Sequence, residues 1–325
     1  MIISASRRTD IPAFYGEWFI NRIREGYFYR VNPFNPKQVK RISLLPEDVD
    51  VIVFWTKNPK NMMRNLEILD QLGYNYYFQY TLNDYPKLFE AKLPSLEERI
   101  DTFIELSCKI GNSKVVWRYD PIIISDKTPT EYHIERFEKI SSQLKGHAER
   151  VVISFLDMYA KLNSKFKKIQ HENNFKIYDI ALPSYRERLI NFAKELKGIA
   201  DNANLDVFTC SEKVDLREYG INHRSCIDTD LINRIFNMNI KYKKDKNQRE
   251  GCLCNESVDV GMYNSCLHEC SYCYANLSHK AVIANFGKHD MYSGILIGSY
   301  DGSVVEDEKA KVENDEGEQL KIPGL

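Results

Sequence analysis

The strongest constraint on the fold is an alternation between short apolar segments and longer amphipathic ones. The short segments are rich in β-branched and aromatic residues and are mostly apolar on both faces, which is typical of strands in a parallel sheet covered by helices. Strands are expected at residues 2–6, 51–55, 76–80, 115–118, 151–155, 205–209 and 258–263. Helices are expected between them, at residues 60–72, 95–110, 130–144 and 184–200.

This alternation also predicts the fold class. A strand with its helix recurs about every 30 to 50 residues, as βα units require, and 325 residues are enough for one α/β barrel. We expect an α/β fold built as a TIM-type βα barrel, complete or partial. An open doubly wound sheet is the alternative, but it needs a glycine-rich phosphate turn after an early strand, which the sequence lacks. Ser95 and Thr130 are expected to cap helices, and Glu98 completes a capping box with Ser95.

Three cysteines late in the chain have the spacing C-x3-C-x2-C: Cys266, Cys270 and Cys273. Thiolates so spaced can bind three irons of a 4Fe–4S cubane and leave the fourth iron open to a small molecule. S-adenosylmethionine (SAM) can chelate such an iron, and an electron from the cluster then yields a 5′-deoxyadenosyl radical. A zinc loop is one alternative, with His268 or His279 as fourth ligand, although zinc sites usually use paired C-x2-C units. Three unligated core cysteines are the other.

Four further cysteines match the ligand count of a second metal centre. Cys210 ends an expected strand, Cys226 lies in a loop, and Cys252 and Cys254 form a C-x-C pair. Together they can hold a closed second iron–sulfur cluster, which would relay electrons or bind substrate, or a structural zinc that fastens this part of the chain to the barrel. Cys108 is left over and is expected in the core, on the apolar face of a helix.

Several segments resemble radical-SAM enzymes of the spore photoproduct lyase (photolyase-like) group. The cysteine loop is similar to the one in that group, including the aromatic Tyr272 directly before the last cysteine. Other similar segments are Trp55-Thr-Lys-Asn-Pro59, Tyr77-Phe-Gln-Tyr-Thr81 and Arg118-Tyr-Asp-Pro-Ile122. The resemblance implies that Lys57 and Tyr272 contribute to cofactor binding.

The order of these segments differs from that group, in which the cysteine loop follows the first strand. Here the loop follows the last expected strand, and the opening Ser4-Ala-Ser-Arg-Arg-Thr-Asp-Ile-Pro12 resembles the second strand of the group. A circular permutation explains both facts and places the strand at 258–263 beside the strand at 2–6, because any βα junction can host the termini. This arrangement is similar to an uncharacterised family known as domain of unknown function 1848, over nearly the whole chain.

The resulting organisation has four parts. Residues 1–210 form the βα barrel core, and residues 211–257 form a connection that carries the second cysteine set. Residues 258–290 supply the last strand, the radical-SAM loop and a helix. Residues 291–325 form a C-terminal extension with an acidic tail.

Polar residues at the ends of the strands are the remaining candidates, because barrels of this kind carry their active residues there. Lys57 can meet the SAM carboxylate as a point charge, and Ser6 and Gln79 can hydrogen-bond SAM. Arg7 and Asp10 are further cofactor-binding candidates, although Arg7 and Arg8 point to opposite faces if extended. Arg118 and Asp120 are the catalytic candidates: Arg118 can grip a carboxylate of SAM or substrate, or form a salt bridge with Asp120 or Asp157. His268 and His279 are expected to hydrogen-bond near the cluster, and His133 is expected to be exposed.

Charge and composition limit the partners. Lys and Arg number 45 against 46 Asp and Glu, for a net charge of −1, so no global field attracts nucleic acid or anionic lipid. The basic segment 241–249 and the acidic tail 306–318 are expected to be solvated. The sequence shows no signal-like start and no apolar run of about 20 residues, which predicts a cytoplasmic protein without a membrane span. In that compartment clustered thiols favour metal over disulfides.

We therefore predict a radical-SAM enzyme that contains a 4Fe–4S cluster and uses SAM. Its electron donor is expected to be a small flavodoxin- or ferredoxin-type protein. The substrate is left open between a peptide, a small molecule and damaged nucleic acid; the photolyase likeness favours repair or lyase chemistry, and the neutral charge weighs against nucleic acid. The alternative is a non-catalytic, zinc-stapled α/β protein, with nucleic-acid binding as one role.

Overall fold

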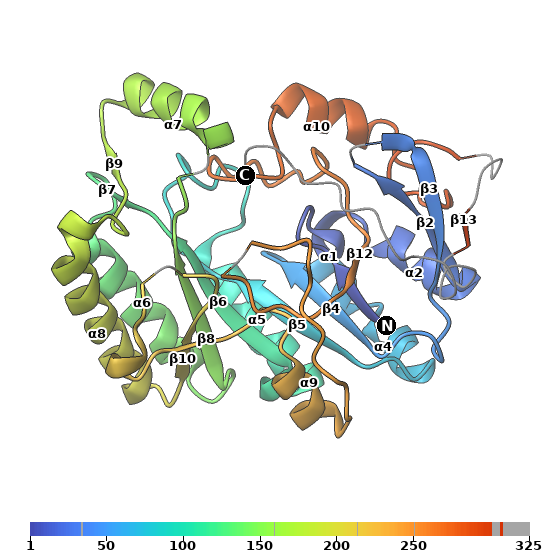
Figure 1. Cartoon of the computed structure of the whole chain (residues 1–325), viewed down its shortest axis with the longest axis horizontal. Coiled ribbons are helices and arrows are strands. Elements are labelled where there is room, and N and C mark those ends of the chain that lie inside the picture. Colours follow the sequence, from blue (N-terminus) through green and yellow to red (C-terminus); the bar gives the residue numbers. More distant parts are fainter. Residues whose placement is uncertain (34, 159, 213, 250, 301–305, 308–325) are drawn as a thin grey trace.

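The computed structural model describes residues 1–33, 35–158, 160–212, 214–249, 251–300 and 306–307. Its main feature is an 8-stranded parallel sheet (Figure 1). The strands of this sheet are β1 (Ile2–Ala5), β4 (Val51–Thr56), β5 (Tyr76–Thr81), β6 (Val115–Ile122), β8 (Arg150–Phe155), β10 (Asp206–Thr209), β11 (Asn222–His223) and β12 (Val258–Asp259). Their order across the sheet is β11-β10-β8-β6-β5-β4-β1-β12. The α/β fold with a parallel sheet, predicted from the sequence, is confirmed.

The last strand lies beside the first, as the permuted order predicted. In the parallel pairing of β12 with β1, Ile3 lies opposite Val258. The other strands follow in chain order away from β1, so the order never reverses as it does in a doubly wound sheet. The closed form of the predicted barrel is not seen. Within the described residues β11 and β12 are the two edges, no pairing joins them, and each is only 2 residues long.

The sheet has two buried faces, since successive side chains of a strand point in opposite directions. One face is covered by helices whose apolar side chains form the main core with residues such as Phe54, Phe78 and Trp117. The helices of the fold are α1 (Ile11–Phe14), α2 (Gly16–Glu25), α3 (Lys60–Met63), α4 (Leu66–Gln71), α5 (Leu96–Ile110), α6 (Thr130–Leu144), α7 (Ala160–Asn173), α8 (Arg186–Asn202), α9 (Thr229–Phe236) and α10 (His279–Phe286).

We call the opposite side of the sheet the inner face. There strand residues such as Val53, Tyr77 and Val116 pack against two apolar residues of the connection. Ile227 lies just before α9, and Leu231 lies within it. The connection that carries the second cysteine set therefore covers this face. It fills the space that the interior of a closed barrel would occupy.

Smaller elements complete the structure. A 3-stranded sheet contains β2 (Tyr27–Asn32), β3 (Asn35–Ser43) and β13 (Glu306–Asp307), and a 2-stranded sheet contains β7 (Ile124–Ser125) and β9 (Ile177–Tyr178). Short 3-10 turns lie at Asn112–Lys114, Pro183–Tyr185 and Arg217–Tyr219. Most of the predicted acidic tail lies outside the described residues. None of the described helices combines the length and apolarity needed to cross a membrane.

The predicted helices form, with differences at their ends. Ser95 caps α5, and Glu98 completes the capping box as predicted. The prediction for Thr130 is wrong: Pro129 is the N-cap of α6 and Thr130 is already its first helical residue. The single helix expected at 60–72 is divided into α3 and α4. Cys108 is exposed rather than in the core, because it lies beside the buried stripe of α5 instead of within it.

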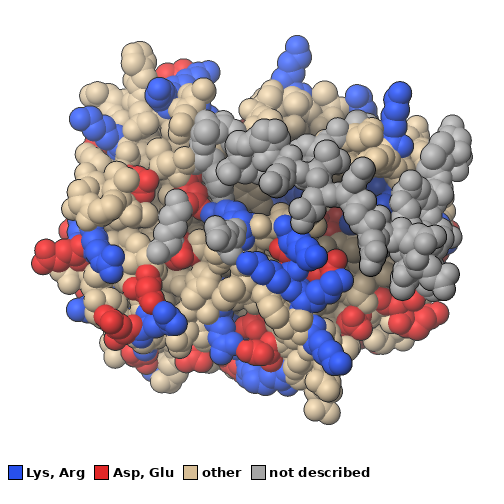
Figure 2. Space-filling model, viewed as in Figure 1, with Lys and Arg blue, Asp and Glu red and all other residues tan. Residues whose placement is uncertain are grey.

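Charged side chains of both signs are mixed on the surface. Figure 2 shows Lys and Arg gathered over the middle of one face, with Asp and Glu among them. Within the basic segment 241–249, Lys243 pairs with Glu256 at 2.5 Å and Arg249 pairs with Asp157. Asp245 of this segment is buried, so only part of it is the solvated loop that was predicted. Acidic partners thus offset the local positive charge.

His133 is fully buried, which corrects the prediction that it is exposed. It lies on the same side of α6 as Phe137, Ile140 and Leu144, at helical spacing. The Tyr119 hydroxyl lies 2.9 Å from His133 Nδ1, and the Ile123 carbonyl lies 3.0 Å from Nε2. A neutral imidazole satisfies both contacts. Burial lowers the pKa of His133 to about 4.

This burial predicts a loss of stability in mild acid. The unfolded chain gains a proton at this residue below about pH 6.5, whereas the folded chain does so only near pH 4. The stabilising contribution of the neutral, buried His133 is therefore intact above about pH 6.5 and declines as the pH falls toward about 4. Between pH 7 and pH 4.5 the protonation of the unfolded chain at this residue should reduce the free energy of unfolding by about 2 to 3 kcal/mol. Urea unfolding at both pH values should show a smaller loss for His133→Gln; equal losses would contradict the assignment.

Candidate functional site

The loop that carries Cys266, Cys270 and Cys273 follows β12 and is closed at its base. The Asn264 amide donates to the Ala275 carbonyl at 2.9 Å. We call this segment the cysteine loop. Burial raises the pKa of Cys266 well above its usual value, and the nearby charges of Asp10 and of the Cys273 and Cys270 thiols add to the rise. The three thiols are therefore close enough to affect one another's ionisation.

Residues in the segments that follow strands of the sheet hold this loop. Asp10, in the segment after β1, lies 2.8 Å from His268 Nε2 and accepts from the Lys57 backbone amide at 2.7 Å. Lys57 is the first residue after β4, and its ammonium donates to Glu90 Oε1 at 2.8 Å. The Tyr272 hydroxyl donates to the same carboxylate oxygen. The loop therefore lies over the carboxyl ends of β12, β1, β4 and β5.

Burial and the nearby charges act in different directions on Cys270. Burial alone would lower the pKa of Lys57, but Glu90 and Cys270 outweigh that effect and the pKa is raised. Burial raises the pKa of Cys270 to about 12, against the opposing effect of Lys57. Lys165 of α7 donates to the Cys270 carbonyl at 3.3 Å and lies near the thiols of Cys270 and Cys273. Two lysines thus lie beside these sulfurs and would offset negative charge if the thiols lost their protons on binding a metal.

Several buried polar atoms of the cysteine loop and its flank have no hydrogen-bond partner among the described residues. They are His268 Nδ1, Ser271 Oγ and Asn276 Oδ1. Leaving such atoms unpaired costs about 1 to 3 kcal/mol each, so native proteins seldom do so without a reason. A small polar ligand or a cofactor at the loop would give these atoms a partner.

The second thiol set, which consists of Cys210, Cys226, Cys252 and Cys254, comes together on the inner face of the sheet. Cys210 Sγ lies 2.6 Å from Cys226 Sγ. Cys226 also hydrogen-bonds Cys254, which in turn bonds Cys252. The sequence predicted that these residues form one group, and the structure brings them into contact. All of them are free thiols.

Three predicted site residues lie at the second thiol set instead of at the cysteine loop. Arg118 Nη1 donates to Cys226 Sγ at 3.1 Å and to Gln79 Oε1 at 3.3 Å. Gln79 Nε2 donates to the Cys226 carbonyl at 2.6 Å. The other side of the Arg118 guanidinium pairs with both oxygens of Asp120, at 3.0 and 2.6 Å. Of the two salt-bridge partners predicted for Arg118, Asp120 and Asp157, the structure shows Asp120. A contact of Arg118, Asp120 or Gln79 with SAM or substrate remains a prediction.

Ser6 and Arg7 join the two groups of cysteines. Ser6 Oγ donates to Asp259 Oδ1 at 2.6 Å, and the Arg7 amide donates to the other oxygen at 2.9 Å. The Arg7 side chain lies near Cys254 and donates to Ser257 and Asp245 of the connection. The backbone carbonyl of Arg7 accepts a hydrogen bond of 2.6 Å from the hydroxyl of Tyr274, which directly follows Cys273. The segment after β1 thus contacts both cysteine groups.

Neither group of thiols is arranged as the complete ligand set of one bound metal ion. Across the described residues, no group of at least three His, Cys, Asp or Glu side chains has that arrangement. Sulfur ligands of a single tetrahedral zinc lie about 3.8 Å apart, which is wider than the Cys210–Cys226 separation. Three thiols that bind three different irons of a cubane need not converge on one point. This finding therefore does not test the hypothesis that the cysteine loop binds a 4Fe–4S cluster.

The family comparison covers both groups of thiols. The family model described as Domain of unknown function (DUF1848) matches residues 2–275. The chain belongs to this family. The membership inferred from the opening and closing motifs is thereby confirmed. No curated protein and no solved structure matches the chain.

Sequence reasoning missed three residues that organise the site of this DUF1848 chain. Glu90 is buried in a loop after β5, where no periodic pattern marks it. Asp259 ends β12, so the strand-end rule that selected Lys57 could have found it. Lys165 lies on α7, a helix that was not predicted. Figure 1 shows α7 and α10 along the same, upper side of the molecule.

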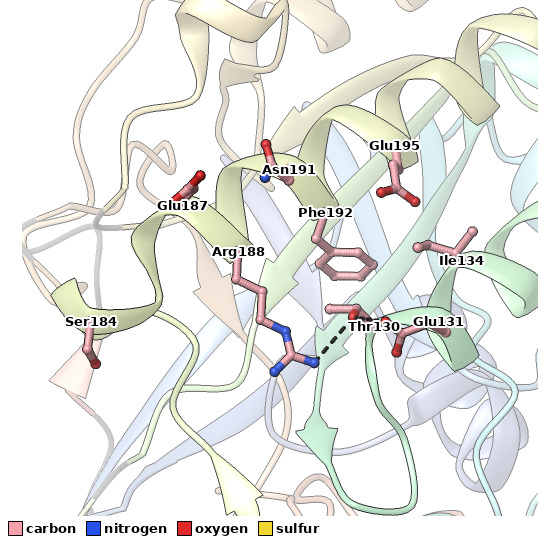
Figure 3. Close-up of a pocket in the computed structure, with 9 residues that line it drawn as sticks. All are labelled: Thr130, Glu131, Ile134, Ser184, Glu187, Arg188, Asn191, Phe192 and Glu195. Atoms are coloured by element: carbon pink, nitrogen blue, oxygen red, sulfur yellow. Dashed lines mark hydrogen bonds between the residues drawn. The ribbon is translucent and has the colours of Figure 1, made fainter.

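A separate pocket in the DUF1848 fold lies between α6 and α8, on the helix-covered side of the sheet. It has a volume of about 560 Å³ and is lined by Thr130, Glu131, Ile134, Ser184, Glu187, Arg188, Asn191, Phe192 and Glu195. Figure 3 shows Arg188 reaching from α8 toward Thr130, to which it donates at 3.3 Å. None of the predicted site residues lines this pocket. We therefore assign it no part in the candidate site.

Proposed function

We propose that this protein is a radical-SAM enzyme whose 4Fe–4S cluster is bound by Cys266, Cys270 and Cys273. The observation that carries the proposal is the meeting of the cysteine loop with Asp10, Lys57 and Glu90 beyond the carboxyl ends of β1, β4 and β5. Active residues of parallel βα folds gather at that end of the sheet. The unreversed strand order, with β12 beside β1, is compatible with an opened, permuted βα barrel of the radical-SAM kind.

When bound, such a cluster supplies the electron that splits the sulfonium C–S bond of SAM and releases a 5′-deoxyadenosyl radical. The residues of the chain form the surroundings in which the cluster and SAM would react. Cys270 and Tyr272 are packed in an apolar cluster with Phe89 and with Leu162 and Phe166 of α7, which limits access of water. A dry surrounding strengthens the electrostatic effect of the charges described above.

Lys57 holds a fixed positive charge beside the loop. Its ammonium lies 5.6 Å from the centre of the Tyr272 ring and is paired with Glu90. A carboxylate arriving from SAM can share this ammonium, which has three donors. His268 is kept in position by Asp10 and has Nδ1 available for a polar group of SAM. These residues bind and orient the cofactor in the proposal.

The substrate would approach the part of the inner face that the connection leaves partly exposed, where Asp120 and Ser154 provide polar groups. Recognition of nucleic acid normally requires a basic face. In the basic segment near this face, Lys243 and Arg249 already pair with carboxylates. A peptide or small molecule fits this environment better than a phosphate backbone does.

The proposal predicts release of 5′-deoxyadenosine. Protein purified without oxygen and reconstituted with iron and sulfide should absorb broadly near about 400 nm. Addition of SAM and dithionite should then yield 5′-deoxyadenosine, measured by chromatography with mass detection. A fully loaded and reduced protein that releases none would disprove the proposal. Zinc without iron in the same preparation would instead favour a non-catalytic, zinc-stapled protein.

A further inference from the structure

The second thiol set consists of side chains from three separate parts of the chain. Cys210 directly follows β10, Cys226 lies before α9, and Cys252 and Cys254 belong to the segment that leads to β12. The separation of 2.6 Å between Cys210 Sγ and Cys226 Sγ is too short for an ordinary contact of unbonded sulfurs and longer than the about 2.05 Å of a disulfide. Four cysteine side chains gathered in one place are typical ligands of a thiophilic metal centre, and binding of such a centre would move Cys210 Sγ and Cys226 Sγ apart.

Two guanidinium groups, one buried and one half-buried, adjoin these sulfurs. Arg118 is only 5% exposed, and its Nη1 is 3.1 Å from Cys226 Sγ. Burial alone would lower the pKa of Arg7, but the charges of Asp259 and then of the Cys254 thiolate raise it, which places Arg7 near Cys254. A centre bound by four thiolates carries net negative charge, and burying such a charge is costly unless cations compensate it. Arg118 and Arg7 contribute to that compensation, although Arg118 also pairs with Asp120 and Arg7 with Asp245.

The spacing and the surroundings favour iron–sulfur over zinc. Structural zinc sites usually take ligands in paired C-x2–4-C units, whereas here the ligands are far apart in sequence except for a C-x-C pair. A hydrogen bond from Arg118 to a ligand sulfur is a feature that adjusts the potential of an iron–sulfur cluster. Zinc has no redox state for such a contact to adjust.

We infer that Cys210, Cys226, Cys252 and Cys254 bind a second iron–sulfur cluster of the 4Fe–4S type on the inner face of the sheet. Every iron of this cluster has a ligand from the protein, unlike the cluster proposed for the cysteine loop. Arg118 is a positioning residue for this cluster through its bond to Cys226. The inference rests on the second thiol set alone and does not depend on radical-SAM activity.

The experiment is an iron and sulfide count on four anaerobically reconstituted proteins. The wild type and a Cys108→Ser control should contain about 8 irons per chain. A variant without the loop thiols (Cys266→Ala, Cys270→Ala and Cys273→Ala) should retain about 4. Cys226→Ala with Cys254→Ala should lose about 4 irons. Cys108 is a suitable control because it is exposed and lies outside both groups of thiols.

Spectroscopy of the loop-thiol variant adds a second criterion. Its remaining cluster should give a paramagnetic resonance signal after reduction, and SAM should leave that signal unchanged because no iron is open. The inference is overturned if this variant holds no iron, holds about one zinc in place of iron, or has its four thiols oxidised to disulfides. If the variant with Cys226→Ala and Cys254→Ala does not fold, the iron content of the loop-thiol variant still tests the inference. A wild type that keeps its iron but releases no 5′-deoxyadenosine would refute only the proposed function.

Discussion

Alanine at Cys270 will abolish the release of 5′-deoxyadenosine in the presence of SAM and reductant. The substitution removes one of the three proposed protein ligands and leaves a second iron without a thiolate, so the cluster is lost or cannot hold SAM productively. Cys270 is packed in an apolar cluster, where the smaller alanine side chain causes no clash. The rate of 5′-deoxyadenosine formation per chain, measured without oxygen, is the test.

The matched control is Cys108→Ala. Cys108 is exposed on α5, and its sulfur lies 3.9 Å from His147 Nδ1, far in the fold from the cysteine loop. This variant should release 5′-deoxyadenosine at the wild-type rate. A Cys270→Ala protein that kept that rate would show that the radical chemistry, if present, does not use this loop.

Methionine at Lys57 will lower the free energy of unfolding by about 3 kcal/mol. Glu90 is 1% exposed at its side chain, and Lys57 is the cation closest to it. Removing one partner of a buried ion pair leaves an uncompensated charge, which costs about 3 to 5 kcal/mol. Arg99 remains 3.7 Å from the other Glu90 oxygen, which favours the lower end of this range. Urea unfolding of cofactor-free protein in reductant measures the change.

A double-variant cycle identifies the cause of this loss. Glu90→Gln removes the buried charge and still accepts a hydrogen bond from Tyr272, so Lys57→Met with Glu90→Gln should regain most of the lost stability. Lys139→Met is the matched control, because Lys139 forms an exposed pair with Glu97 at 3.1 Å and should change stability by less than about 0.5 kcal/mol. Equal losses for Lys57→Met and Lys139→Met would show that Glu90 does not need Lys57.

The parallel sheet could be predicted because its strands are apolar on both faces. Val51, Phe54 and Val116 show this plainly, since one side of each strand meets helices and the other meets the connection. The failure to close into a barrel could not be predicted. It depends on β11 and β12 being 2 residues long and on Ile227 and Leu231 packing into the inner face. Contacts of that kind leave no periodic signal in the sequence.

The errors on individual residues have separate causes. His133 was judged by its polarity, although its spacing from Phe137 and Ile140 already placed it on the buried side of α6. Thr130 was judged by its capping propensity, although a proline directly before it can occupy the N-cap position. In both cases the helical period and the neighbouring residue held more information than the residue type.

The candidate site could be predicted where it depends on strand ends and cysteine spacing. Lys57 and Asp10 were chosen because they follow strands, and both contact the cysteine loop or its partners. Gln79 and Arg118 were chosen by the same rule but lie at the second thiol set, because their side chains point to the inner face. Glu90 could not be found, since its role depends on tertiary contacts of an irregular loop.

The pairing of β1 with β12 has a consequence for biosynthesis. Asp10 and its partner His268 are separated by 258 residues, and β1 lies between β4 and β12 within the sheet. At a translation speed of about 5 to 20 residues per second, β1 emerges from the ribosome on the order of 10 to 50 seconds before the strand that completes its pairing. A nascent chain lacking β12 and the segment after it leaves one side of β1 unpaired. Loading of the cluster proposed for the cysteine loop would therefore wait until that late segment has been made.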